Sequence, residues 1–172
     1  MTGAEIEIKR LTAADAARYR EVRLEALRLA PEAFSSTFAA ENAEPLVWFA
    51  ARLESSVVFA AACGERLLGI AAFLPKRGKE AHKGLLVGMY VRQANRNRGT
   101  GRRLAEAVVE HAAGKVEILQ LAVVADNQTA RRLYARLGFV EYGIERRALK
   151  RDGHYWDEVL MAKPLTPPQG AR

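Results

Sequence analysis

The sequence lacks the features that mark disulfide-rich, membrane-spanning or secreted proteins. Cys63 is its only cysteine, which excludes an internal disulfide framework. No apolar run approaches the roughly 18 residues of a membrane-spanning helix, so we expect no membrane partner. The N-terminal MTGAEIEIKRL alternates apolar and charged side chains and contains no apolar segment typical of a secretory signal. These absences predict a cytoplasmic protein.

Metal-ligand patterns, internal repeats and low-complexity segments are lacking as well. His82, His111 and His154 have no metal-ligand spacing, and we expect no metal site. The chain of 172 residues has the length of one domain and is long enough to bury a core. We therefore expect a single domain at residues 1–165 and a flexible C-terminal tail at 166–172.

Acidic residues are outnumbered by basic ones. The net charge is +7 and the isoelectric point is about 9.9, with arginine supplying most of the excess. Such a balance favours anionic partners, which include nucleic acid, acidic protein and phosphorylated small molecules. A basic surface also serves solubility alone, so the placement of the charge decides between these alternatives.

Hydrophobic periodicity predicts the element order β-α-α-β-β-β-α-β-α-β-β. Hairpins are mixed with two strand–helix–strand crossovers, which indicates an α/β (mixed α+β) fold with a mixed sheet. Residues 31–44 read as a polar-aromatic connection. The expected strands are 4–10, 57–63, 67–75, a strand ending at Val91, 116–124, 139–149 and 154–163. The expected helices run from an N-cap at Thr12 to about Leu29, from Pro45 to Leu53, over 99–113 and over 127–137.

The stretch NRNRGTGRRL, from Asn95 to Leu104, places a Gly-Thr-Gly turn between a strand and a helix. The dinucleotide fingerprint G-x-G-x-x-G would need glycine at position 104, and the P-loop spacing is absent. A glycine turn before a helix still presents unpaired N–H groups at the positive end of the helix dipole, where no Cβ blocks an anion. The surrounding arginines add positive charge, which predicts a pyrophosphate site: Arg96, Arg98, Arg102 and Arg103.

That turn alone is weak evidence for a binding site, because an ordinary exposed basic loop has the same pattern. A second motif lies in ADNQTARRLYARLGF, Ala125 to Phe139. The pair R-x-x-G-x-G on Arg96–Gly101 and N-x-x-A-x-x-L-Y-x-x-x-G-F on Asn127–Phe139 resembles the GCN5-related N-acetyltransferase (GNAT) superfamily. The element order resembles that family from residue 4 to about 165, and the second motif is long and specific.

The resemblance implies a GNAT-type fold with a central mixed, splayed sheet flanked by helices, and acetyl-CoA as cosubstrate. The pyrophosphate would bind the glycine turn, and the pantetheine arm would bind the backbone of the strand ending at Val91. The arm would enter a gap between this strand and the strand at 116–124, and residues 119–124 would line the other side of that gap. Asn127 would contact the cofactor arm, and Tyr134 would lie near the thioester sulfur as the catalytic residue. The implied cofactor-binding residues are Met89, Tyr90, Val91, Arg96, Asn97, Arg98, Gly99, Thr100, Gly101, Arg102, Asn127 and Tyr134.

Helical geometry supports the last two residues independently. Asn127 and Tyr134 are seven positions apart, about two helical turns, so both project from one helix face. The small side chain of Ala130 on the same face leaves room for a ligand. A half-buried core tyrosine is the alternative for Tyr134.

Acetyl transfer to an amine requires a neutral amine, a stabilised oxyanion and a leaving thiolate. A tyrosine hydroxyl near pKa 10 protonates a thiolate near pKa 8.5 only if its surroundings lower the tyrosine pKa. The sequence does not identify the general base, because each candidate can also be an ordinary surface side chain. The candidates are Glu21, Glu25, Glu41, Glu44, His154, Asp157 and Glu158. The sequence does not identify the acceptor amine either. Several aromatic residues would line an acceptor pocket if they did not pack in the core: Phe34, Phe38, Trp48, Tyr155 and Trp156.

The sequence therefore predicts an acyltransferase that acetylates a primary amine of a small molecule, an amino acid or a protein. A non-catalytic acetyl-CoA-binding regulatory module on the same fold is the alternative, since fold does not fix function. We expect no nucleic-acid partner, because the basic residues gather at one glycine turn instead of forming a stripe with aromatic side chains. A homodimer, and acyl groups other than acetyl, remain open at this point.

Overall fold

The computed structural model describes residues 5–165, so the tail expected at 166–172 lies outside the described residues. Strand neighbours follow the order β1-β2-β3-β4-β5-β7-β6, a mixed and mostly antiparallel sheet with flanking helices, as predicted. The chain divides into two compact units, and β3, β4 and α4 contribute one end to each. Among the described residues, none of the helices has the length and apolar character needed to span a bilayer.

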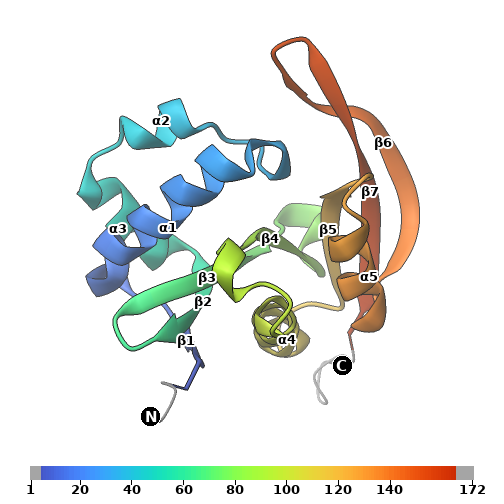
Figure 1. The fold of residues 1–172 in the computed structure, drawn as a ribbon. Coiled ribbons are helices and arrows are strands. Elements are labelled where there is room, and N and C mark those ends of the chain that lie inside the picture. Colours follow the sequence, from blue (N-terminus) through green and yellow to red (C-terminus); the bar gives the residue numbers. More distant parts are fainter. Residues whose placement is uncertain (1–4, 166–172) are drawn as a thin grey trace. The chain divides into compact units, whose positions relative to one another are not determined.

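The first unit comprises residues 1–72 and 88–107. It contains β1 (Glu7–Arg10), α1 (Ala16–Leu29), α2 (Phe38–Asn42), α3 (Leu46–Ser55), β2 (Val57–Cys63) and most of β3 (Arg66–Pro75). Figure 1 shows α1, α2 and α3 grouped together in blue to cyan. Their apolar faces form one core with β2 and β3, in which Val22, Leu27 and Phe49 are almost fully buried.

Three expectations in this unit need correction. Residues 31–44 are not only a connection, because they contain the short 3-10 turn Pro31–Ala33 and helix α2. Pro45 is the N-cap of α3 and not a residue of its first turn. The first strand begins at Glu7, later than predicted.

The second unit comprises residues 73–87 and 108–172. It contains the start of β4 (Lys83–Val91), the end of α4 (Thr100–Ala113), β5 (Ile118–Val124), α5 (Gln128–Arg136), β6 (Val140–Arg151) and β7 (His154–Pro164). The register pairs Lys83 to Leu85 of β4 with Ile118 to Gln120 of β5 in parallel, while β7 runs antiparallel to β5 and β6.

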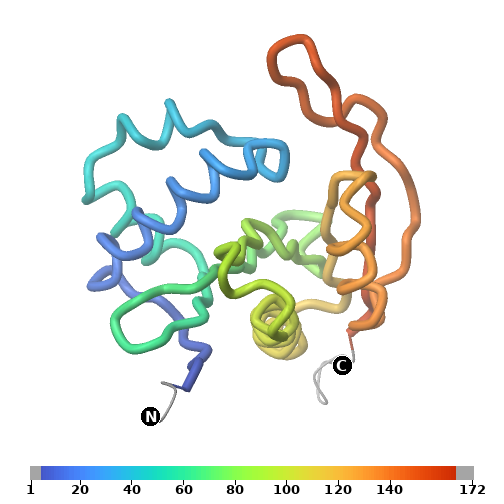
Figure 2. The backbone as a smooth tube through the Cα atoms, in the orientation of Figure 1, coloured from blue at the N-terminus to red at the C-terminus, as the bar shows by residue number. Residues whose placement is uncertain are grey.

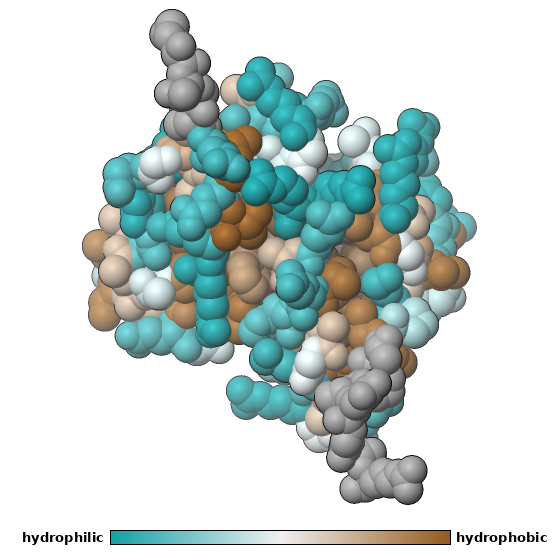
Figure 3. Space-filling model, turned by 90° about the horizontal axis from the view of Figure 1, so that it is seen from below, coloured by the Kyte–Doolittle hydropathy of each residue, from teal (hydrophilic) through white to brown (hydrophobic). Residues whose placement is uncertain are grey.

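The long β6–β7 hairpin turns at Asp152 and Gly153, as predicted, and can be followed in orange to red in Figure 2. Both residues have positive φ, 49° and 80°, which is the backbone that a tight hairpin turn of this kind requires. On the face drawn in Figure 3, hydrophilic side chains in teal surround smaller groups of hydrophobic side chains in brown.

Candidate acetyl-CoA site

The end of β4 carries the backbone predicted to bind the cofactor arm, at Met89, Tyr90 and Val91. Gly88, directly before these residues, has φ +64°, so the regular extended backbone is interrupted in the middle of the strand. Glycine inside a strand often marks such an irregularity, and a side chain there would be strained. Gly88 was not among the predicted site residues, although an isolated glycine within an apolar strand signals such an irregularity.

The side chain of Tyr90 anchors this backbone within the first unit. Its buried hydroxyl donates a hydrogen bond to Glu25 on α1 at 3.0 Å, and Arg92 lies 3.5 Å from the same carboxylate. Burial, followed by the hydrogen bond and charge of Glu25, raises the pKa of Tyr90. On β3, a Cβ at Gly69 would lie only 2.6 Å from the carbonyl oxygen of Tyr90, so glycine permits the close approach of the two strands.

The glycine turn follows β4 and leads into α4. Asn97 and Gly99 have positive φ, 58° and 77°, so left-handed residues alternate along the turn. Such alternation turns successive N–H groups toward one side and forms an anion-binding concavity. Arg96, Asn97, Arg98 and Gly99 are exposed, whereas Thr100 is buried at the first position of α4 and its hydroxyl has no hydrogen-bond partner among the described residues.

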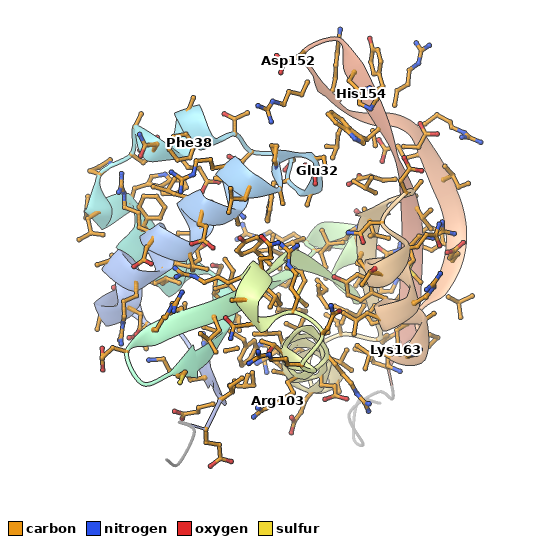
Figure 4. All side chains as sticks on the ribbon, viewed as in Figure 1. Glu32, Phe38, Arg103, Asp152, His154 and Lys163 are labelled. Carbon is orange, nitrogen blue, oxygen red and sulfur yellow. The ribbon has the colours of Figure 1, made fainter. Side chains whose placement is uncertain are left out.

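The arginines around the turn differ in what they already contact. Arg96 donates through Nε to the carbonyl oxygen of Val91 at 2.9 Å, and Arg102 pairs with Glu106 on α4 at 2.7 Å. Arg98 and Arg103 are exposed, and Arg103 is labelled in Figure 4 on α4. The turn therefore combines oriented backbone with several accessible positive charges, which suits a phosphate group.

Helix α5, in the second unit, carries the other two predicted site residues. Asn127 is the exposed N-cap, and its Oδ1 accepts a hydrogen bond from the backbone nitrogen of Ala130 at 3.1 Å. Tyr134 is buried, and its ring stacks edge-on against Phe139 with centroids 5.8 Å apart. The Tyr134 hydroxyl makes no hydrogen bond within residues 5–165, so it has donor capacity to offer a ligand.

Burial raises the pKa of Tyr134, and within residues 5–165 no arginine offsets this effect. Full proton transfer from this hydroxyl to a thiolate is therefore less favourable than transfer from a tyrosine of ordinary pKa. The hydroxyl is protonated at neutral pH, as in an ordinary tyrosine, so it remains a hydrogen-bond donor.

The other residues considered as a base or as part of an acceptor pocket differ in their contacts. The carboxylate of Glu41 is buried in an ion pair with Arg23, and Trp48 packs edge-on against Phe49 at 4.9 Å between centroids. Asp152 and His154 lie near the tip of the β6–β7 hairpin (Figure 4). Among residues 5–165, no cluster of three or more His, Cys, Asp or Glu side chains has the arrangement of a metal site.

The mixed sheet, the glycine turn between β4 and α4 and the α5 motif together define an acetyltransferase fold. A family model described as the acetyltransferase (GNAT) family matches residues 22–139. The chain belongs to this family.

Individual relatives agree with this assignment. An L-methionine sulfoximine/L-methionine sulfone acetyltransferase of Pseudomonas paraeruginosa is 28% identical over 151 residues, which is 81% of this chain and 87% of the relative. A GNAT-family acetyltransferase from Streptococcus pneumoniae superposes with a TM-score of 0.83 at 25% identity, over 94% of this chain and all of that one. A phosphinothricin acetyltransferase from Sinorhizobium meliloti, solved with acetyl-CoA, gives a TM-score of 0.80 at 18% identity, over 96% and 95% of the two chains.

Proposed function

We propose that this protein transfers the acetyl group of acetyl-CoA directly to a primary amine of a small molecule, an amino acid or a protein. The observation that carries the proposal is the glycine turn between β4 and α4, with its alternating left-handed residues and exposed arginines. The named acceptors of the Pseudomonas relative are amino-acid derivatives, so amino acids belong among the first acceptors to test.

The predicted site residues would bind different parts of the cofactor. Residues Arg96 to Arg102 hold the pyrophosphate, and the backbone of Met89 to Val91 binds the pantetheine arm. Asn127 contacts the arm through its side-chain nitrogen Nδ2, because its Oδ1 already accepts the capping hydrogen bond of α5. Tyr134 donates a hydrogen bond to the sulfur as negative charge develops there during C–S cleavage.

An amine panel tests the proposal. Thiol release from acetyl-CoA is followed with L-methionine sulfone, other amino acids, a diamine and a short peptide as acceptors. We expect release to depend on at least one primary amine and to stop when that amine is blocked. Acetyl-CoA binding without amine-dependent release would favour the regulatory module instead.

Acetyl-CoA should stabilise the folded chain. A ligand at a hundred times its Kd adds about 2.7 kcal/mol to the free energy of unfolding. Because S-acetylpantetheine lacks the pyrophosphate, it should raise the melting temperature less at the same concentration. Equal shifts from both compounds would contradict a pyrophosphate site at the glycine turn.

Gly101→Val should weaken acetyl-CoA binding at least about tenfold, because a branched side chain at the start of α4 crowds the anion and the helix entry. Isothermal titration calorimetry measures the affinity, and circular dichroism checks that the variant folds. Gly114→Val is the matched control, since a Cβ at Gly114 meets no atom within 4 Å. Parental affinity in a folded Gly101→Val would leave the turn without a binding role.

A further inference from the structure

The strands β5, β7 and β6 present two faces of different character. Residues directly opposite each other on antiparallel strands point to the same face, and the face alternates along each strand. One face carries Leu121, Val123, Val159 and Met161, which are all buried. The other face carries the row formed by Val124 on β5, Glu158 on β7 and Glu145 on β6.

Asp157 and Glu158 are adjacent on β7, so they lie on opposite faces of the sheet and have different surroundings. Asp157 faces away from Glu158 and accepts hydrogen bonds from the Arg146 side chain at 2.6 Å and the Arg147 backbone nitrogen at 2.8 Å. Glu158 is half-buried, and within residues 5–165 its carboxylate makes no hydrogen bond or ion pair. A carboxylate that burial partly removes from water is ordinarily paired, so this one is available to bind a proton or a cation.

The charged neighbour that acts on Glu158 is another carboxylate. Glu145 lies directly across on β6, while the facing residue on β5 is Val124 and the same-face neighbours along β7 are Trp156 and Leu160. Burial first, and the charge of Glu145 second, raise the pKa of Glu158. Like charges directly opposite each other in a sheet cost stability, which makes a functional reason for the pair more compelling.

The position of Glu158 relates it to Asn127, the residue proposed to contact the cofactor arm. Its cross-strand partner Val124 is the last residue of β5, and the Val124 carbonyl accepts a hydrogen bond from the nitrogen of Asn127 at 2.9 Å. Two positions along the same face, Trp156 presents an aromatic ring beside His154, with centroids 4.4 Å apart. An aromatic ring and an unpaired carboxylate on one face suit an ammonium group.

We propose that Glu158 is the general base of the reaction and receives the ammonium group of the acceptor. This inference rests on the proposed function and names one of the several acids that the sequence left open. Four of the other candidates are already in ion pairs in the structure: Glu21 and Glu25 with Arg92, Glu41 with Arg23, and Asp157 with Arg146.

The Glu158 carboxylate takes one proton from the ammonium group, and the freed nitrogen lone pair attacks the thioester carbonyl carbon. The C–N bond forms and the C–S bond breaks, so coenzyme A leaves as a thiolate. The second proton lost by the nitrogen neutralises the thiolate through solvent, and Glu158 releases its own proton to solvent. The products are one acetylated amine, one thiol and one proton.

Glu158→Gln tests the assignment through a pH profile with the best acceptor from the amine panel. Loss of a general base typically costs about 100-fold or more, so we expect kcat to fall by about that factor near pH 7. The defect should shrink as pH approaches the pKa of the amine itself, about 10.4 for a lysine-like acceptor, because the amine is then neutral without a base. A merely structural role would give a defect that does not change with pH.

Two further variants keep the test decisive. Glu145→Gln removes the facing charge, so it should lower the pKa of Glu158 and move the acidic limb of the kcat/KM profile to lower pH. Glu141→Gln is the matched control on the same strand pair, where Glu141 forms an exposed ion pair with Arg131. It should retain parental turnover.

The outcomes separate this inference from the proposed function. Parental turnover in a folded Glu158→Gln, or an unmoved acidic limb in Glu145→Gln, overturns Glu158 as the base while leaving the acetyltransferase intact. A parent protein that binds acetyl-CoA but acetylates no amine overturns the proposed function itself.

Discussion

Tyr134→Phe is expected to lower turnover about 100-fold while leaving acetyl-CoA affinity close to that of the parent. The ring and its edge contact with Phe139 remain, and only the hydroxyl is lost. Loss of one donor to a developing negative charge costs about 100-fold or more. Because the interaction is made mainly in the transition state, kcat and kcat/KM should fall together. Steady-state kinetics and calorimetry measure the two quantities.

Tyr142→Phe is the matched control, because Tyr142 is an exposed tyrosine on β6. It should behave as the parent does. A tenfold loss in Tyr134→Phe, about 1.4 kcal/mol, would indicate that water partly replaces the hydroxyl. Parental turnover would exclude Tyr134 from the chemistry and remove the strongest reason to prefer an enzyme over a binding module.

Glu41→Ala is expected to lower the free energy of unfolding by about 3–5 kcal/mol, because it leaves a buried guanidinium without its partner. Arg23 on α1 donates through Nε and Nη2 to the two carboxylate oxygens of Glu41 on α2, at 2.9 and 2.6 Å. Both residues are almost fully buried. Denaturant unfolding measures the change, and Glu106→Ala, which breaks the exposed pair with Arg102, should cost less than about 1 kcal/mol.

The same pair gives stability a pH dependence of known sign. Burial alone would raise the pKa of Glu41, but the hydrogen bond and charge of Arg23, with Ser36 and Arg52, outweigh it and lower the pKa below its ordinary 4.5. The stabilisation is therefore complete above the unfolded-state pKa and is lost as pH falls through the lower folded-state value. Glu41→Ala should flatten this acid dependence. Similar losses in Glu41→Ala and Glu106→Ala would contradict a buried pair.

Local signals in the sequence were sufficient for most of the fold. Strand β2 has the same bounds as the strand predicted from its apolar run. The hairpin to β3 turns at Gly64, whose φ of +58° suits glycine. Helix α2 was missed, because its five residues FAAEN have no helical periodicity. Its structure depends on Thr37 as N-cap and on the ion pair of Glu41 with Arg23, which lies 18 positions away. Tertiary contacts of this kind are not visible in local patterns.

The two motifs of the predicted cofactor site could be recognised in the sequence for a related reason. A glycine turn and the α5 motif are each contiguous, so the residues that define them are neighbours in sequence. The burial of Tyr134, which raises its pKa, and the pairing of Glu158 with Glu145 depend on residues brought together by the fold. Asn127 was placed on the helix face by spacing alone, whereas its φ of −78° and ψ of 72° make it the N-cap.

The most direct measurement of the central claim is identification of the acetylated product. The protein is incubated with acetyl-CoA carrying a ¹³C-labelled acetyl group and the amine panel, and mass spectrometry and NMR follow the label while free thiol is quantified. The account predicts that the label appears on the nitrogen of a primary amine, with one thiol released for each acetylated nitrogen. Acetyl-CoA that binds tightly yet transfers no label to any amine would contradict it.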